Sequence, residues 1–488
     1  MTLTHDGLVT GPARFRPRGQ DDLAPSGAAS RVAANLAALR ALRALQAGER
    51  PATPDEQAVL ARWSGWGAVP QVFDDDRAEF AAARAELRQL LSDAEYAAAR
   101  RTTINAHYTD AALAKVVWDH VTALGFGGGQ VLEPGCGSGN FIGLAPPGAQ
   151  VLGVELDPVT AAIAARLYPD AEVRCESFAD TRLPDGHFDL VVGNVPFSAA
   201  RLHDRRYNAA GHSMHNHFII KSLTFLKPGG LLAVLTSRYT MDAQDPSARE
   251  EMAGLASLVE AVRLPSGAHR RAAGTEAVTD LLVLRRHEPG TPGAWPQWRR
   301  AFETSLDGGT VWINEYWRDH PENVLGSFTV GQGQYHDHDL TVRPSGDLSG
   351  VASQLAARLA ARPATVAAQA VPAGDTGRFE GTLRANGDGS FSVLRDGSWQ
   401  SWPCPATQAG ELRDLLGLRD TVAALLDAEA SSPADTPAIA GLRAELNRRY
   451  DAYAAGYGPV NRMSWKRTGK TDTEGNDVLA RQRPPQGK

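Results

Sequence analysis

A nine-residue segment, Asp189–Phe197, combines residue types suited to holding a planar, amino-bearing group. It reads Asp-Leu-Val-Val-Gly-Asn-Val-Pro-Phe, so a short apolar run ends in a glycine before the polar positions begin. The side-chain oxygen of Asn194 and the backbone carbonyl of Val195 can each accept a hydrogen bond from an NH2 group. Pro196 restricts the residue before it to extended conformations, and the ring of Phe197 offers a stacking face. The segment predicts a pocket for an amino group on a flat ring.

A glycine-rich turn upstream has the residue types of a cofactor-binding loop. Residues 131–141 read Val-Leu-Glu-Pro-Gly-Cys-Gly-Ser-Gly-Asn-Phe, so an apolar run precedes the turn and a helix start follows it. Glycine lets the backbone approach a ligand where a Cβ atom would clash. The N-terminus of the following helix offers free N–H groups to a carboxylate or phosphate. The candidate residues of this turn are Glu133, Gly135, Gly137 and Gly139.

An acidic residue follows the turn at the spacing typical of nucleoside cofactors. Glu155 lies twenty residues after Gly135 and ends a second apolar run, where a carboxylate can accept from both ribose hydroxyls. The glycines do not follow the G-x-G-x-x-G pattern of dinucleotide sites. Glu133 stands directly before the turn and can meet an ammonium group, which methionine has and a pyrophosphate lacks. S-adenosylmethionine (AdoMet) is therefore favoured over NAD, and a tight turn without a ligand is the structural alternative.

In their order along the chain, these segments resemble the amino-group methyltransferases, especially the N6-adenine DNA methyltransferases. The resemblance covers residues 105–286 and rests on Glu133–Phe141, Glu155, Glu176-Ser-Phe178 and Asn194-Val-Pro-Phe197. It implies that the first motif binds the methionine part of AdoMet and that Glu155 binds the ribose. Glu176 and Phe178 then frame the adenine of AdoMet. The order, with the cofactor motif before the catalytic motif, resembles the gamma arrangement.

Two positions depart from the pattern of that family. Tyr108 and Thr109 look like the family's segment that precedes the first motif and touches the cofactor, but Asp110 stands where a proline is usual. Thr109 is also the expected N-cap of the helix that follows. Val195 stands where a second proline is usual, and the chemistry there needs only its backbone carbonyl.

The implied reaction explains the segment around Asn194. The N6 nitrogen of adenine is a weak nucleophile because its lone pair is delocalised into the ring. If Asn194 and the Val195 carbonyl each accept one N6 proton, the nitrogen becomes tetrahedral and its lone pair points at the sulfonium methyl group. Phe197 then stacks on a target base that has been rotated out of the double helix. The resemblance thus implies a site-specific adenine DNA methyltransferase.

Other readings of the same residues stay open. Protein-glutamine and ribosomal-RNA-guanine methyltransferases carry similar Asn-Pro-Pro-aromatic segments, and a non-catalytic DNA-binding module could keep the fold. A strand-ending turn with a buried Phe197 is the structural alternative. The flanks resemble the N-terminal part of methyltransferase–helicase polypeptides of phages and mobile elements, yet no G-x-x-x-x-G-K-[ST] or DEAD-like motif is present. The resemblance of the flanks to DNA-modifying polypeptides favours DNA as the binding partner. Because the chain has no helicase motif, a helicase in another chain is a second expected partner.

Seven short apolar runs must position these residues. They are 130–133, 150–155, 171–175, 189–193, 231–236, 258–264 and 280–284, with helices expected at 158–167 and 214–226. Alternating strands and helices predict a doubly wound parallel sheet. The last two runs are joined by a loop without helical period, which predicts an antiparallel seventh strand. The expected fold is α/β, a Rossmann-like, seven-stranded class I AdoMet methyltransferase sheet.

The flanks of the sheet differ in composition from it. The expected parts are a helical N-terminal arm (1–104), the methyltransferase domain (105–288), an irregular aromatic-rich extension and linker (289–376), a small β-hairpin module (377–410), and a helical segment with a disordered basic tail (411–488). Within the arm, Trp63-Ser-Gly-Trp66-Gly could stack on nucleic acid, but docking of the arm onto a core is favoured.

Composition and charge narrow the function classes. Hydrophobic and charged contents of 43% and 22% are those of a soluble globular protein, and there is neither a signal peptide nor an apolar run that could span a bilayer. Three cysteines in 488 residues favour a cytoplasmic protein without disulfides. The net charge of −6 confines nucleic-acid binding to local patches. The candidates are Arg201, Arg205, Arg206, His269, Arg270 and Arg271. No metal site is expected, and the cluster His212, His215 and His217 lacks a nearby carboxylate or thiolate at ligand spacing.

Overall fold

The computed structural model describes residues 2–3, 9–10, 14–103, 108–288, 298–331, 339–361, 382–395, 398–430, 435–460, 464–471 and 477–482. The chain divides into two compact units, Met1–Pro372 and Ala373–Lys488. Among the described residues, none of the helices combines the length and the apolar character that crossing a bilayer requires.

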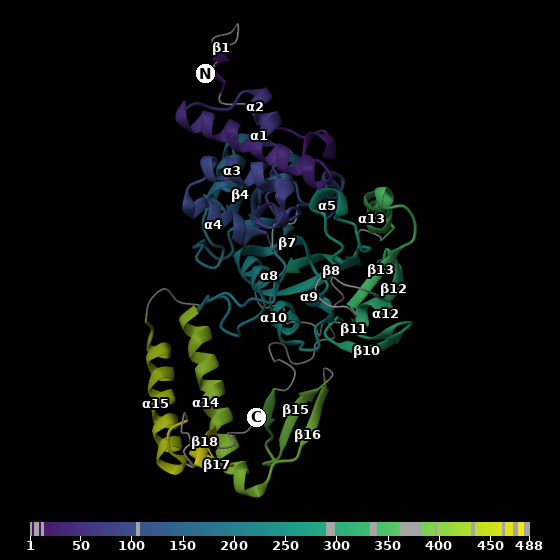
Figure 1. The fold of residues 1–488 in the computed structure, drawn as a ribbon. Helices are drawn as coiled ribbons and strands as arrows, with labels where there is room; N and C mark the ends of the chain where they lie inside the picture. The colour runs from purple at the N-terminus through teal and green to yellow at the C-terminus, as the bar shows by residue number, and fades with distance from the viewer. Residues whose placement is uncertain are drawn as a thin grey trace. The chain divides into compact units, whose positions relative to one another are not determined.

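A seven-stranded sheet forms the centre of the first unit (Figure 1). Its strands are β3 (Gly129–Pro134), β4 (Ala149–Glu155), β5 (Glu172–Cys175), β6 (Phe188–Asn194), β7 (Leu226–Ser237), β8 (Ala256–Arg263) and β9 (Thr279–Arg286). They lie in the order β5-β4-β3-β6-β7-β9-β8, and β9 alone runs antiparallel to its neighbours. The predicted seven-stranded sheet with an antiparallel last strand is confirmed.

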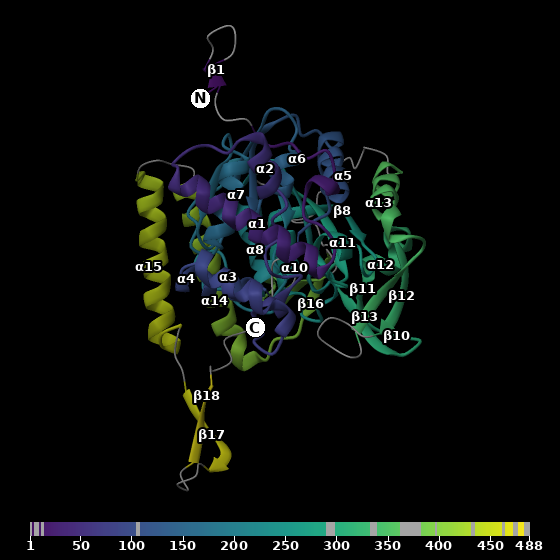
Figure 2. The same ribbon diagram turned by 45° about the horizontal axis from the view of Figure 1, so that its top comes forward.

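Helices cover both faces of this sheet (Figure 1 and Figure 2). They are α5 (Ala111–Ala123), α6 (Asn140–Leu144), α7 (Pro158–Leu167), α8 (Met214–Phe225), α9 (Tyr239–Asp242), α10 (Ser247–Leu255) and α11 (Arg270–Ala273). Successive residues of a strand point to opposite faces. Val131 of β3 accordingly packs in the cluster that includes α5 and α7, while Leu132 packs in the cluster that includes α8 and α10. The sheet is therefore buried on both sides, as its nearly continuous apolar strands require.

The N-terminal arm belongs to the same core. Its helices are α1 (Ala28–Ala47), α2 (Pro54–Leu60), α3 (Ala81–Leu90) and α4 (Asp93–Thr102). Capping boxes begin two of them, at Thr53 before α2 and at Ser92 before α4. Trp63 and Trp66 are 2% and 1% exposed and lie in one hydrophobic cluster with β3 and α5. Their predicted role in docking the arm is confirmed.

Two local expectations were wrong. The N-cap of α5 is Asp110, whose side chain accepts from the backbone N–H of Ala112, and not Thr109, which is buried one residue earlier. Residues 228–230, expected to separate a helix from a strand, lie inside β7. That strand follows α8 directly, and its pairing with β6 shifts register between Leu226 and Leu231, where Gly229 adopts a positive φ of 74°.

The extension after the sheet is more regular than its sequence predicted. It contains the antiparallel pairs β10–β11 (Ala301–Leu306, Gly309–Asn314) and β12–β13 (Gly326–Gly331, Asp339–Pro344), together with α12 (Glu315–Asp319) and α13 (Val351–Ala360). Residues 289–297, 332–338 and 362–376 of the predicted extension and linker lie outside the described residues. Strand β11 shows the alternation of burial that is typical of a strand with one buried face. Val311 and Ile313 are buried in the core, and Trp312 between them is only partly buried.

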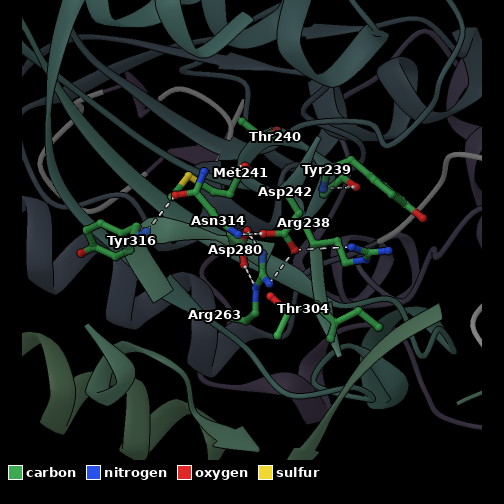
Figure 3. Close-up of polar contacts among 12 residues, drawn as sticks. Arg238, Tyr239, Thr240, Met241, Asp242, Arg263, Asp280, Thr304, Asn314 and Tyr316 are labelled. Atoms are coloured by element: carbon green, nitrogen blue, oxygen red, sulfur yellow. Dashed lines mark hydrogen bonds and ion pairs between the residues drawn. The ribbon is translucent and has the colours of Figure 1, made fainter. Parts of the chain in front are cut away.

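A buried ion cluster ties this extension to the sheet (Figure 3). Arg263 of β8 is fully buried and donates to both carboxylate oxygens of Asp280 at 2.7 and 2.8 Å and to Asp242 at 2.7 Å. Asp242 also accepts from the backbone N–H of Asn314 at 3.0 Å. The guanidinium is thereby satisfied by two carboxylates, and the hairpin β10–β11 is fixed to the edge of the sheet.

The second unit combines a small sheet with a helix pair. Its elements are β14 (Leu383–Ala385), β15 (Phe391–Arg395), β16 (Ser398–Trp402), α14 (Ala406–Ala430), α15 (Pro437–Tyr457), β17 (Ser464–Thr471) and β18 (Asp477–Gln482). The predicted β-hairpin is a three-stranded sheet, and Phe391 shares a core with Leu412 and Leu416 of α14. The described strands of this sheet thus pack against α14. A disordered tail was expected from Lys466, whereas β17 and β18 form an antiparallel pair, since main-chain pairing needs no apolar side chains.

Candidate active site and cofactor cavity

A cavity of about 540 Å³ lies at the carboxyl ends of β3, β4 and β6. This is a size typical of small-molecule sites, and the position is the usual one in open α/β sheets. Ten residues singled out from the sequence line it: Tyr108, Thr109, Glu133, Gly135, Gly137, Glu155, Glu176, Phe178, Asn194 and Pro196. The fold therefore brings the predicted cofactor residues and the Asn194 segment to one space.

Three other predicted residues do not line the cavity. Val195 and Phe197 are 1% and 9% exposed and pack in the interior beside it. Gly139 lies beneath the turn, where an added Cβ atom would stand 2.5 Å from the ring of Tyr168. Its positive φ of 89° therefore serves close packing of the turn, not a ligand.

The glycine turn exposes its backbone to the cavity. Gly137 has a φ of 56°, a conformation that other residues rarely adopt. Its N–H donates to Glu155 Oε2 at 2.9 Å. The neighbouring Tyr108 is buried, and burial together with the nearby Glu155 carboxylate raises the pKa of its hydroxyl. Asn140, at the start of α6, donates from its side chain to the carbonyl of Thr109 at 2.9 Å and so fixes the segment before α5 to the turn.

Glu133 presents an unsatisfied acceptor to the cavity. The side chain is 2% exposed, and burial raises its pKa well above the ordinary value, although the backbone N–H of Ile142 donates to it. Its Oε2 atom has no hydrogen-bond partner among the described residues. A buried acceptor without a donor is rare in native proteins. A cationic ligand group such as an ammonium would supply the missing donor and hold the carboxylate ionised.

Glu155 is held in place by two backbone N–H groups. Gly137 donates to its Oε2 atom at 2.9 Å and Asp157 donates to its Oε1 atom at 2.8 Å. Burial raises the pKa of Glu155 to about 7 in spite of these bonds. A carboxylate has about four acceptor positions, so roughly two remain for hydroxyl groups of a ligand. The residues present therefore fit a cofactor that has an ammonium and a ribose.

Further lining residues had weak or no signals in the sequence. Leu156 directly follows Glu155 and is 66% exposed, which is unusual for a large apolar side chain beside a cavity. Its position after the acidic residue is the signal that could have found it. The arm contributes Gly65 and, from α4, Ala94, Glu95, Ala98 and Arg101. These residues lie far from the motifs in sequence, and nothing in their local pattern indicates the contact.

The target end of the cavity is built on β6 and α8. Asn194 ends β6, and the N–H of Val195 donates to the carbonyl of Leu235 on β7 at 3.1 Å, which fixes the peptide between Asn194 and Val195. Apolar side chains complete this end: Pro196, Leu202, Met214 and Phe218.

A buried lysine joins the target end to the cofactor end. Lys221 of α8 is fully buried and donates to the Phe178 carbonyl at 2.6 Å, to the Ala179 carbonyl at 3.0 Å and to Asp204 Oδ2 at 2.8 Å. Asp204 belongs to the loop after the Asn194 segment. Burial lowers the pKa of Lys221, opposed by Asp204. Burial alone would raise the pKa of Asp204, but the ammonium lowers it below the ordinary value. The pair is therefore ionised and spans both ends.

Most of the predicted phosphate-binding residues already have partners within the chain. His269 is 1% exposed and contacts Thr279, so the prediction for this residue was wrong. Three of the predicted arginines form ion pairs at 2.5–2.7 Å: Arg206 with Asp185, Arg270 with Glu276 and Arg271 with Asp21. Arg201 and Arg205 are exposed, and within the described parts of the chain neither forms an ion pair.

The histidine cluster has separate partners. His212 pairs with Glu251 at 2.7 Å, and His217 pairs with Asp204 at 3.2 Å. His215 contacts the hydroxyl of Ser213 at 3.0 Å. Among the residues that the structure describes, no three His, Cys, Asp or Glu side chains are arranged to hold a metal ion.

Comparisons with known proteins agree with this site. A family model described as a methyltransferase domain matches residues 132–234. The chain is 30% identical over 208 residues to the Defense against restriction protein B of Escherichia phage P1, which is 41% of this chain and 9% of that protein. It is also 30% identical over 115 residues to the Modification methylase CviBIII of Paramecium bursaria Chlorella virus NC1A, which is 22% of this chain and 30% of that protein. The chain thus spans a small part of both relatives.

Solved structures give a weaker likeness. The type I restriction-modification system methyltransferase subunit of Streptococcus thermophilus overlaps 52% of this chain and 66% of its own, with 15% identity and a TM-score of 0.32. We draw nothing from so partial an overlap. The family match itself runs from β3 to β7 and includes Glu133, Glu155 and Asn194. Residues 132–234 therefore match a methyltransferase domain, built on this seven-stranded sheet, with S-adenosylmethionine as its cofactor.

Proposed function

We propose that this protein transfers a methyl group from AdoMet to the N6 nitrogen of adenine in DNA. The carrying observation is that Asn194 and Pro196 line the same cavity as Glu133 and Glu155. An acceptor for an amino group thus lies in the same space as the acidic residues that fit the cofactor. In this proposal Glu133 binds the ammonium, Glu155 binds the ribose, and Glu176 and Phe178 frame the adenine of the cofactor.

The chain's own residues contribute positioning at the target end. The Asn194 oxygen and the Val195 carbonyl each accept one N6 proton, so the nitrogen lone pair is freed from the ring. AdoMet, when bound, supplies the electrophilic methyl group. As the new N–C bond forms and the bond from the methyl carbon to sulfur breaks, the nitrogen gains positive charge, which the two hydrogen-bond acceptors stabilise until the excess proton passes to water. The bond from Val195 N–H to Leu235 anchors the chain at the end of β6, and Pro196 restricts Val195 to extended conformations, which helps to aim its carbonyl. Positioning and charge stabilisation then carry the catalysis without a strong base.

The target base must leave the double helix to reach this cavity. Pro196, Leu202 and Met214 offer an apolar rim. Stacking by Phe197 remains a prediction, and it requires the ring to turn out of the interior. The relatives lend support through their names, which are a modification methylase and a defence-against-restriction protein. A role beside restriction systems and a helicase acting from another chain are parts of the same proposal.

Methyl transfer from labelled AdoMet tests the proposal directly. DNA, ribosomes and release factors should be offered in parallel, because glutamine and guanine amino groups suit a similar pocket. Label in DNA, recovered as N6-methyladenine after digestion and absent from Asn194→Ala, is the expected result. Label in protein or RNA, or DNA labelling that survives Asn194→Ala, would overturn it.

A further inference from the structure

The tryptophan loop of the N-terminal arm reaches the cofactor cavity. Gly65 lines the cavity, and two residues before it the indole N–H of Trp63 donates to the hydroxyl of Thr160 at 3.0 Å. Thr160 belongs to α7, which begins just after Glu155 on β4. This contact joins two parts of the chain that are 97 residues apart.

From Thr160 a continuous series of hydrogen bonds leads to the acidic residue at the ribose position. The Thr160 hydroxyl and backbone N–H donate to Asp157 Oδ2 at 2.7 and 2.8 Å. The backbone N–H of Asp157 donates to Glu155 Oε1 at 2.8 Å. A hydroxyl has a single proton. Because Thr160 gives that proton to Asp157, it has a lone pair free to accept from Trp63, and the series has one direction from the arm to Glu155.

The arm holds Trp63 firmly. Asn35 of α1 is fully buried, donates to the carbonyl of Gly65 at 2.6 Å and accepts from the backbone N–H of Ser64 at 2.9 Å. Trp66 packs edge-on against Trp63 with ring centroids 5.7 Å apart. The indole donor is therefore presented by a loop that Asn35 binds at two backbone groups and that Trp66 packs against.

The arm also supplies part of the cavity wall. Ala94, Ala98 and Arg101, at spacings of four and three residues, lie on one face of α4 and line the cavity together with Leu156 and Asp157. Two alanines leave space on that face. A wall and a hydrogen-bond series from the same arm thus converge on the segment 155–157.

We propose that the helical arm is an integral part of the AdoMet site, and that Trp63 is a positioning residue that orients Glu155 through Thr160 and Asp157. The proposal rests on the cofactor and on the role of Glu155 in binding its ribose, and it is independent of the methyl acceptor. It makes the motif Trp63-Ser-Gly-Trp66-Gly a cofactor-site element, beyond its role in docking the arm.

Trp63→Phe against Trp66→Phe is the matched test. Both indoles are buried in the same loop, but the Nε1 atom of Trp66 has no hydrogen-bond partner among the described residues. AdoMet affinity, measured by calorimetry on the full chain, should fall roughly three- to tenfold in Trp63→Phe, as expected for one lost hydrogen bond, and stay within about twofold in Trp66→Phe. The loss of AdoMet affinity in Thr160→Val should be similar to that in Trp63→Phe. Thr160→Ser, which keeps the hydroxyl, should bind AdoMet with the wild-type affinity.

A double-mutant cycle with Glu155→Gln tests the route. If Trp63 acts through Glu155, Trp63→Phe should cause little further loss in the Glu155→Gln background. In turnover assays Trp63→Phe should raise the KM for AdoMet and leave kcat unchanged. Equal losses in Trp63→Phe and Trp66→Phe, or fully additive losses with Glu155→Gln, overturn the proposal.

The outcome is separable from that of the proposed function. Binding is measured without any methyl acceptor, so the expected pattern in AdoMet affinity supports the role of the arm even if DNA is not methylated. Conversely, DNA methylation by the wild type with unaltered AdoMet affinity in Trp63→Phe leaves the proposed function standing and rejects the role of Trp63.

Discussion

The two ends of the cavity solve different electrostatic problems. At the cofactor end, buried Glu133 and Glu155 have raised pKa values and accept few or backbone-only hydrogen bonds. At the target end, the polar groups are the neutral Asn194 amide and a backbone carbonyl, and the charges of Lys221 and Asp204 are paired with each other. A cationic cofactor is thus met by charge, whereas a neutral amino group is met by geometry. Substitutions should therefore separate cofactor binding from turnover.

Removing the lysine that joins the two ends should have the largest effect. Lys221→Met leaves Asp204 2% exposed without its ammonium partner, so we expect the free energy of unfolding to fall by about 3–5 kcal/mol. Chemical denaturation measures it. Lys227→Met is the control, because that lysine pairs with Asp189 but is 45% exposed, and its loss should cost less than about 1 kcal/mol. Similar losses in both variants would contradict a special role for the buried pair.

The next effect should be confined to turnover. Asn194→Ala removes one acceptor of the developing charge, so single-turnover methyl transfer should fall roughly 10²–10³-fold. AdoMet affinity in calorimetry should change by less than about twofold, because each tenfold change needs about 1.4 kcal/mol of lost contact. A large loss of AdoMet affinity in this variant would erase the contrast between the two ends.

The mirror-image effect is expected at the cofactor end. Glu133→Gln keeps an acceptor for the Ile142 N–H but removes the negative charge that an ammonium meets. The lost charge-assisted contact is worth about 1.5–3 kcal/mol, or roughly a ten- to hundredfold loss of AdoMet affinity. At saturating AdoMet, kcat should stay near the wild-type value. A fall in kcat with unchanged AdoMet affinity would contradict the assignment of Glu133 to the cofactor end of the cavity.

The raised pKa of Glu155 predicts a pH dependence that the target end lacks. In the folded state this carboxyl binds its proton up to about pH 7, against an ordinary value of 4.5. The folded protein without AdoMet therefore holds more protons than the unfolded chain between these values, so Glu155 lowers stability as the pH rises through this window. AdoMet requires the ionised form, so its affinity should increase over the same window. Thermal unfolding with and without AdoMet tests both slopes, and Glu155→Gln should flatten them.

The smallest effect should come from the exposed arginines beside the target end. Arg201→Ala combined with Arg205→Ala should lower DNA affinity at all sequences and reduce the slope of log affinity against log salt by about 1 per arginine. Fluorescence anisotropy over a salt series measures the slope. Arg270→Ala is the control, because Arg270 is already paired with Glu276. An unchanged slope in the double variant would remove these arginines from the DNA contact.

Local sequence was sufficient for the parts of the site that lie on single elements. The apolar runs before Glu155 and Asn194 predicted β4 and β6. A buried strand between helices is a short, nearly continuous series of apolar residues, and such a series can be recognised locally. The glycines after Glu133 predicted the turn, since Gly137 adopts a positive φ. Thr109 was assigned the cap that Asp110 forms, because both residue types cap helices and only the backbone geometry selects one.

Contacts between distant segments could not be predicted in this way. Nothing in residues 94–101 indicates that they face Leu156 and Asp157. Likewise, the sequence does not distinguish Arg270 and Arg271 from unpaired surface arginines. Only the positions of Glu276 and Asp21 in the structure show that both are ion-paired. The aromatic extension was expected to be irregular because strand pairing there depends on partners that its own sequence does not specify.

By itself, the sequence determined the order of the strands along the chain, the glycine turn, and the chemical types of Glu133, Glu155 and Asn194. These follow from periodicity and residue type, which act over a few residues. The tertiary structure alone decided that Glu133 Oε2 has no donor, that Lys221 links both ends, and that Trp63 reaches Thr160. Burial and pairing depend on which remote segments pack together, and that is settled only when the sheet, its helices and the arm share one core.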